Sequence, residues 1–192
     1  MALLSYYYFD FNDTAKQDFH GLVTSLLAQL SAQSDSCYDI LSELYSTNNA
    51  GLRRRLQPAN HALTKSLKEM LKLPRQPTIY IIVDALDECL NTFKSQKKKT
   101  EREKVMDLLE ELVDLKLGNL RICVTSRPEI DILNILEPLT SQLMSLHDEN
   151  GQKEDILNYI ATSVSNDRKT RRWSAEDKQL VIEMLSAKAD GM

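Results

Sequence analysis

The stretch Thr78-Ile-Tyr-Ile-Ile-Val-Asp-Ala-Leu-Asp-Glu-Cys89 decides the fold of this chain. Its apolar part, Ile79 to Val83, is β-branched or aromatic throughout, which predicts a short strand buried on both faces, as in a parallel sheet. Three carboxylates follow directly, those of Asp84, Asp87 and Glu88. Ligands of α/β sheets bind at the carboxyl ends of the strands, and acids placed there typically hold a hydrated cation and activate water for phosphoryl transfer. The alternative is a strand that ends in a solvated acidic loop.

Length, charge and hydropathy bound the class of protein. The 192 residues suit one domain with a sizeable core, and the net charge of −4 argues against a general nucleic-acid binder. No run approaches the roughly 20 apolar residues of a membrane span. The apolar N-terminus lacks the basic region and the cleavage site of a signal peptide. We therefore expect a cytoplasmic protein that binds neither membranes nor nucleic acid.

The three cysteines, Cys37, Cys89 and Cys123, are odd in number and lack paired spacing. This spacing favours free thiols in a reducing compartment over a disulfide framework or a zinc site.

Strand and helix patterns alternate along the chain. An aromatic strand at residues 3–9 precedes a helix that Thr14 is expected to cap, and a further strand is expected at residues 120–125. The basic segment 91–104 is interpreted as a solvated loop. Other helices are predicted within 34–56, between Pro58 and Pro74, over 105–113, 130–136 and 155–164, and after Ser174, with a weak last strand at 142–146. This alternation predicts βαβ units and a mainly parallel sheet in an α/β fold.

A second strand tip carries groups that complement the acids. Residues 120–125 lead into Thr125, Ser126 and Arg127. Parallel strands end on the same side of a sheet, so these groups and the carboxylates are expected to converge. Carboxylates for a metal and a fixed guanidinium for a terminal phosphate are the electrostatic parts of phosphoryl transfer. Pro128 disfavours α geometry at Arg127 and keeps it extended. Taken alone, an arginine such as Arg127 is more often a surface residue than a phosphate ligand.

A series of motifs stands in order over almost the whole chain. They are Tyr6-Tyr-Tyr-Phe-Asp-Phe-Asn-Asp13, Ile81-Ile-Val-Asp-Ala-Leu-Asp-Glu-Cys89, Val124-Thr-Ser-Arg-Pro-Glu129, Asp155-Ile156 with Tyr159-Ile160, Arg172-Trp173 and Lys188-Ala-Asp-Gly-Met192. In these motifs the chain resembles the NACHT domains of the STAND class of P-loop NTPases, especially fungal NACHT proteins with a nephrocystin-like N-terminal region.

The resemblance implies a role for each residue that matches a motif. Asp84 would be the Walker B acid that binds Mg²⁺ through water, and Asp87 or Glu88 would orient or deprotonate the attacking water. Arg127 would be the sensor 1 arginine that reads the γ-phosphate. The intact family would bind Mg²⁺ with ATP or GTP and use it to control oligomerisation, which implies NACHT homo- or hetero-oligomers as partners. The implied fold is a three-layer P-loop NTPase-type α/β sheet in residues 1–150, followed by the start of a helical domain in 151–192.

The family's Walker A loop, G-x-x-x-x-G-K-[ST], does not occur in this sequence, and no glycine precedes Gly21. Without it there is no nest of backbone N–H groups around the phosphates, no P-loop lysine and no hydroxyl ligand for the metal. Hydrogen bonds to charged groups contribute roughly 1.5–3 kcal/mol each, so losing several removes on the order of 6–10 kcal/mol. We therefore expect this chain alone to bind no cofactor and to be inactive as an enzyme.

The missing segment also concerns the sheet. In the family the Walker A strand lies beside the sensor 1 strand, so residues 120–125 are expected to have unpaired backbone groups unless the strand at 142–146 closes the gap. Two functions fit: a fragment of a NACHT signalling NTPase, or a catalytically dead interaction module that docks on intact NACHT proteins. The absence of G-x-G-x-x-G excludes a Rossmann-type dehydrogenase.

Overall fold

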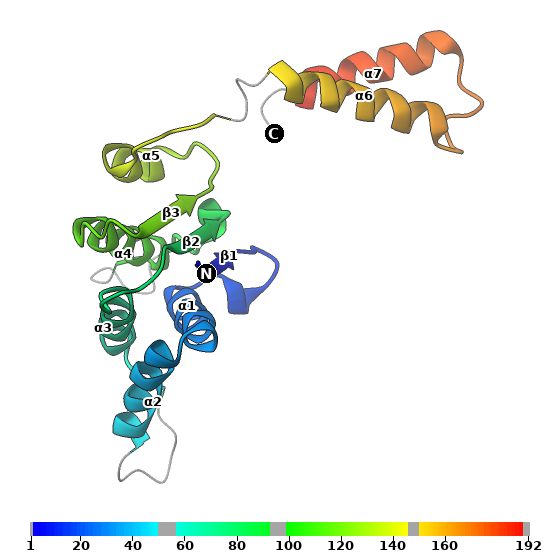
Figure 1. The fold of residues 1–192 in the computed structure, drawn as a ribbon. Helices are drawn as coiled ribbons and strands as arrows, with labels where there is room; N and C mark the ends of the chain where they lie inside the picture. The colour runs from blue at the N-terminus through cyan, green and yellow to red at the C-terminus, as the bar shows by residue number, and fades with distance from the viewer. Residues whose placement is uncertain (1, 50–56, 93–98, 146–149, 190–192) are drawn as a thin grey trace. The chain divides into compact units, whose positions relative to one another are not determined.

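The computed structural model describes residues 2–49, 57–92, 99–145 and 150–189. The chain divides into two compact units, Met1–Thr140 and Ser141–Met192, which are described one at a time (Figure 1). The domain boundary expected after residue 150 stays a prediction.

The first unit is built on a parallel sheet of three strands within the described residues, in the order β1-β2-β3 (Figure 1). The strands are β1 (Leu3–Tyr8), β2 (Ile79–Asp84) and β3 (Leu120–Val124). Leu3 pairs with Ile79, and Ile79 pairs with Leu120, so the strands run in step. The predicted α/β fold with a parallel sheet is confirmed, and the acid-bearing strand β2 is its centre.

Helices connect the strands and bury one face of the sheet. The helices of this unit are α1 (Phe19–Gln33), α2 (Asp35–Asn49), α3 (Asn60–Leu71), α4 (Glu101–Asp114) and α5 (Ile130–Leu136), with short 3-10 turns η1 (Thr14–Lys16), η2 (Leu86–Glu88) and η3 (Glu137–Leu139). Ile79, Ile81 and Val83 of β2 are fully buried in the core with apolar residues of α1, α3 and α4. The expectation that residues 79–83 are buried on both faces is wrong for the opposite face of the sheet, where Tyr80 is 44% exposed and Tyr6 of β1 is 52% exposed.

Two helix starts differ from the sequence-based expectation. Thr14 opens the turn η1, and Asp18 caps α1 by accepting the N–H of Gly21 at 2.8 Å. Helix α4 begins inside the segment expected to be a loop, because Thr100 and Glu103 form a capping box. The Thr100 hydroxyl accepts the N–H of Glu103 at 3.1 Å, and the Glu103 carboxylate accepts the N–H of Thr100 at 2.7 Å.

The outer edge of β1 is closed by two glutamines of α1. The Gln33 side chain accepts the N–H of Leu4 at 3.0 Å and donates to the Leu4 carbonyl at 2.6 Å. The Gln29 side chain does the same for Tyr6, at 3.0 and 2.7 Å. A side-chain carboxamide carries the same donor and acceptor as a peptide group, so these two residues replace the neighbouring strand that β1 lacks.

The second unit contains α6 (Asn150–Asn166) and α7 (Ala175–Ala189), which pack against each other. The capping signal predicted at Ser174 is confirmed, because its hydroxyl accepts the N–H of Asp177 at 3.1 Å. The strand expected at residues 142–146 is wrong for 142–145, which are irregular, and residue 146 lies outside the described part of the chain. Leu143 and Met144 are both exposed, so no apolar burial stabilises an extended conformation there.

Within the described residues, none of the helices combines the length and apolar character needed to cross a membrane.

Candidate functional site

The ends of β2 and β3 are joined by a set of short hydrogen bonds. The Thr125 hydroxyl donates to a carboxylate oxygen of Asp84 and accepts the N–H of Ala85 at 3.0 Å. The N–H of Thr125 donates to the Val83 carbonyl at 2.9 Å, and its carbonyl accepts the N–H of Leu86 at 3.0 Å. The two strand tips are therefore held together through Thr125, and Asp84 lies at this junction.

Ala85 turns the chain sharply after Asp84. Its φ of 53° and ψ of 48° lie in the left-handed region, which disfavours any residue with a Cβ. This turn buries Leu86 completely and starts η2, which carries Asp87 and Glu88. Backbone strain of this kind is concentrated at functional sites and is kept only where the surrounding contacts fix it.

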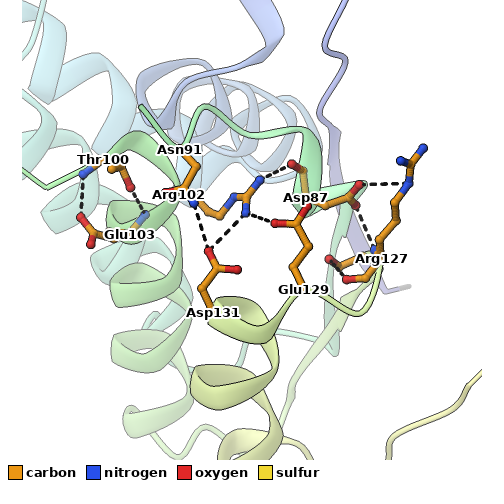
Figure 2. A network of polar contacts seen from close by, with 9 residues as sticks. Asp87, Asn91, Thr100, Arg102, Glu103, Arg127, Glu129 and Asp131 are labelled. Carbon is orange, nitrogen blue, oxygen red and sulfur yellow. Dashed lines mark hydrogen bonds and ion pairs between the residues drawn. The ribbon is translucent and has the colours of Figure 1, made fainter. Parts of the chain in front are cut away.

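Asp87 holds Arg127, as the sequence predicts for groups at neighbouring strand tips. One carboxylate oxygen accepts the N–H of Arg127 at 3.0 Å, and the other lies 3.5 Å from its Nε (Figure 2). The Asp87 side chain is 8% exposed, whereas that of Arg127 is 79% exposed. The backbone of Arg127 is thus fixed on a buried carboxylate while its guanidinium extends into solvent.

Glu88 and Asp84 also have partners within the protein. The Glu88 carboxylate accepts the N–H of Phe11 at 2.9 Å and so connects η2 to the segment after β1. Asp84 and the Thr125 hydroxyl supply hard oxygen ligands of the kind that suits hydrated Mg²⁺. In the described part of the chain, no group of three or more His, Cys, Asp and Glu residues is placed to hold a metal. The oxygens fit part of a magnesium site and do not form a complete cage.

Arg102 is a residue of this site that the sequence interpretation missed. Its side chain is only 6% exposed. Its guanidinium donates to the Asp87 carbonyl and to the Glu129 carboxylate, and lies 3.2 Å from an Asp131 oxygen (Figure 2). Burial lowers the pKa of Arg102, but hydrogen bonds to Glu129 and Asp131 outweigh it, so the pKa is raised above its ordinary value. A buried cation requires such partners.

We call Arg102, Asp87, Glu129 and Asp131 the Arg102 clamp. It joins the loop after β2, the first turn of α4 and the start of α5. Arg127 lies between Asp87, which grips its backbone, and Glu129, whose N–H donates to the Arg127 carbonyl at 2.8 Å. The clamp therefore fixes both sides of the segment that carries the exposed guanidinium.

A signal for Arg102 exists in the sequence. It precedes Val105, Met106 and Leu109 at helical spacing, which places it on the buried face of α4. The interpretation of residues 91–104 as a solvated loop hid this spacing.

Comparison with known families places the site in context. The family model described as Nephrocystin 3, N-terminal matches residues 1–127. The chain belongs to this family. The matched region contains all three strands of the sheet and ends at Arg127, so it includes both strand tips. No curated protein and no solved structure matches the chain.

A separate groove of about 720 Å³ lies in this nephrocystin 3 N-terminal chain between the start of α1, α3 and α4. None of the residues that line it belongs to the strand tips. Lys68 pairs there with Glu111 at 2.6 Å, and Lys104 pairs with Glu101 at 2.6 Å. Two of the lysines that line the groove are therefore paired with carboxylates of the protein.

Proposed function

We propose that this chain is the acid- and arginine-bearing part of a NACHT-type signalling NTPase of the STAND class, and that it is inactive alone. One observation carries the proposal. Asp84 and Arg127 follow adjacent parallel strands at the same edge of the sheet, with the guanidinium fixed at its base and free at its end. Membership of the nephrocystin 3 N-terminal family and the motifs shared with NACHT proteins support it.

In this proposal each residue acts from its place at the strand tips. Asp84, with the Thr125 hydroxyl beside it, would hold Mg²⁺ through water, and Arg127 would contact the γ-phosphate of ATP or GTP. The metal would neutralise charge that develops on the phosphates. Asp87 or Glu88 would position the attacking water, but each now binds a backbone N–H and would first have to release it.

The chain offers no group that replaces the Walker A loop. The strand tips supply carboxylates, one hydroxyl and one exposed guanidinium that pairs with Asp87 through its Nε, whereas a triphosphate requires several backbone N–H donors and a lysine. The deficit of about 6–10 kcal/mol carries a micromolar affinity beyond any measurable range. Nucleotide control of NACHT homo- or hetero-oligomers would thus need the loop from elsewhere.

Isothermal titration with Mg-ATP and with Mg-GTP tests whether the chain alone binds nucleotide, and saturable micromolar binding would contradict the proposed inactivity.

Fusing a family Walker A strand, loop and helix to the N-terminus tests the roles proposed for Asp84 and Arg127. The fusion is expected to bind Mg-nucleotide, and Asp84→Asn or Arg127→Ala should each weaken binding at least about tenfold. Arg121→Ala is the matched control, because it removes an exposed arginine of β3 and should leave the affinity unchanged. An equal loss of nucleotide affinity in all three variants would refute the roles assigned to Asp84 and Arg127.

The second candidate is a catalytically dead interaction module that docks on intact NACHT proteins. The outer edge of β3, beside which the described residues form no further strand, favours it. Size-exclusion chromatography with an intact homologue separates the two candidates, because only the module should co-elute with it.

A cytoplasmic location accompanies both proposals. The three cysteines are free thiols, as expected in a reducing compartment.

A further inference from the structure

The connection between α6 and α7 presents a serine that follows two arginines (Figure 1). Its sequence is Arg171-Arg-Trp-Ser174, and all of these side chains are exposed in the second unit. The segment lies outside both helices, because α6 ends at Asn166 and α7 begins at Ala175. The two guanidinium groups and the hydroxyl are therefore displayed together on one short irregular segment.

The Ser174 hydroxyl is held by the first turn of α7. It accepts the N–H of Asp177 at 3.1 Å and donates to the Asp177 carboxylate at 2.7 Å. A backbone hydrogen bond closes the turn before it, from the N–H of Trp173 to the Thr170 carbonyl at 3.0 Å. Because the ends of helices fray readily, these contacts can open and free the hydroxyl while α6 and α7 stay packed together.

Thr170 lies in the same connection and provides a contrast. It follows Arg168 and Lys169, but it is only 9% exposed. Its hydroxyl donates to the carbonyls of Val164 and Asp167, at 2.5 and 3.0 Å. The fold thus buries one hydroxyl that follows basic residues and exposes the other.

We propose that Ser174 is a phosphorylation site for a protein kinase that selects arginines two and three positions before the acceptor. Such a kinase binds the arginines through its own carboxylates. The γ-phosphoryl group of Mg-ATP passes to the Ser174 Oγ. The Oγ–P bond forms, the bond from the γ-phosphorus to the β,γ-bridging oxygen breaks, and ADP leaves. The hydroxyl proton passes to the catalytic aspartate of the kinase. The proposal does not depend on the nucleotide site of this chain.

Glu176 and Asp177 raise the alternative of a kinase that selects acids after the acceptor. Both carboxylates belong to the first turn of α7, and that of Asp177 is bonded to Ser174. A kinase that reads them in an extended segment must unwind this turn, whereas the two arginines already lie outside a helix. The conformation of the chain therefore favours the arginine-directed class.

The phosphate changes the charge of the connection. It carries about −1.5 to −2 elementary charges at pH 7 and so offsets about half the charge of the exposed basic side chains before it. These are Arg168, Lys169, Arg171 and Arg172. A dianionic phosphate has no proton to donate to Asp177, and it repels that carboxylate. Phosphorylation therefore releases the Asp177 side chain from the helix cap.

Treating the full chain with the catalytic subunit of cAMP-dependent protein kinase and Mg-ATP tests the site, since this enzyme selects arginines at those positions. Tandem mass spectrometry should find a phosphate on Ser174 and none on Thr170. A phosphate on Thr170, or none on Ser174, would overturn the proposal. An acid-directed casein kinase should leave Ser174 unmodified under the same conditions, and modification by that enzyme alone would refute the choice of kinase class.

Variants of the arginines test the recognition without removing the helix cap. Arg171→Ala and Arg172→Ala should each lower kcat/KM for phosphorylation of Ser174 at least about tenfold. Arg168→Ala is the matched control, because it removes an exposed arginine of the same connection and should leave kcat/KM unchanged. The same kcat/KM in all three variants would refute recognition through Arg171 and Arg172.

Discussion

Replacing Arg102 by methionine should destabilise the first unit by about 2–4 kcal/mol. The change removes the donor to the partly buried Asp87 carbonyl, and a buried acceptor left without its partner costs about 1–3 kcal/mol. It also removes the ion pairs with Glu129 and Asp131. Those carboxylates are 43% and 39% exposed, so water can replace the guanidinium, and their share is reduced to about 1 kcal/mol. Methionine retains most of the buried stem, which keeps the packing loss small.

Amide exchange measured by mass spectrometry is the assay, because the single tryptophan, Trp173, belongs to the second unit and does not report on the first. Peptides from β2 and β3 should exchange faster in Arg102→Met by the factor that corresponds to the lost free energy. Arg127→Met is the matched control. It removes a guanidinium that is 79% exposed and should change stability by less than about 0.5 kcal/mol.

The double variant Arg102→Met with Glu129→Gln isolates the ion pair. The loss of unfolding free energy in the double variant should be about 1 kcal/mol smaller than the sum of the losses in the two single variants, because each single change already breaks the same contact. The clamp would be refuted if Arg102→Met cost no more than Arg127→Met, or if the two changes of the double variant were additive.

Two further predictions concern the sheet edge and the buried acids. Changing Gln29→Ala and Gln33→Ala together should expose the edge of β1 and make the chain self-associate, which light scattering would detect as a larger mass. A mass equal to that of the unchanged protein would contradict the closing role. Burial raises the pKa of Cys89 from 9.0 and of Tyr7 from 10.0, each to about 12. Both groups are neutral when protonated. Their contribution to the free energy of unfolding is therefore complete below pH 9 and is lost as the pH rises toward 12. Circular dichroism should show alkaline unfolding in that window. Cys89 should be alkylated only there, whereas Cys123 should be alkylated at neutral pH. Unfolding that begins below pH 9 would contradict this reasoning.

The strands and their tips could be predicted because they depend on local pattern. The β-branched run before Asp84 is too short and too apolar for an amphipathic helix, and it has the length of a buried strand. Parallel strands end on one side, which brings Arg127 to the acid cluster, and the Asp87 contact confirms that they meet. The sequence does not disclose that Asp87 is buried. That follows from the left-handed turn at Ala85, a conformation that alanine does not favour.

The remaining features depend on contacts between distant segments. Gln29 and Gln33 look like ordinary polar residues on the exposed side of α1, and only the position of β1 shows that they replace a strand. Arg102 lies in a basic segment whose composition suggests solvent exposure, although its helical spacing places it inward. The strand expected at residues 142–146 does not form over 142–145, because two apolar residues do not make a strand without a surface on which to bury them.

The clamp explains how this chain fixes the position of Arg127 with its own residues. Every contact that fixes Arg127 comes from residues between Asp87 and Asp131, and none requires a nucleotide. Affinity and architecture are therefore separable in this fold: the Walker A loop would supply most of the binding energy, whereas the position of the arginine is set by a buried carboxylate and a buried guanidinium. For this reason an intact acid and arginine arrangement is evidence for the family and its fold, and it does not by itself establish activity.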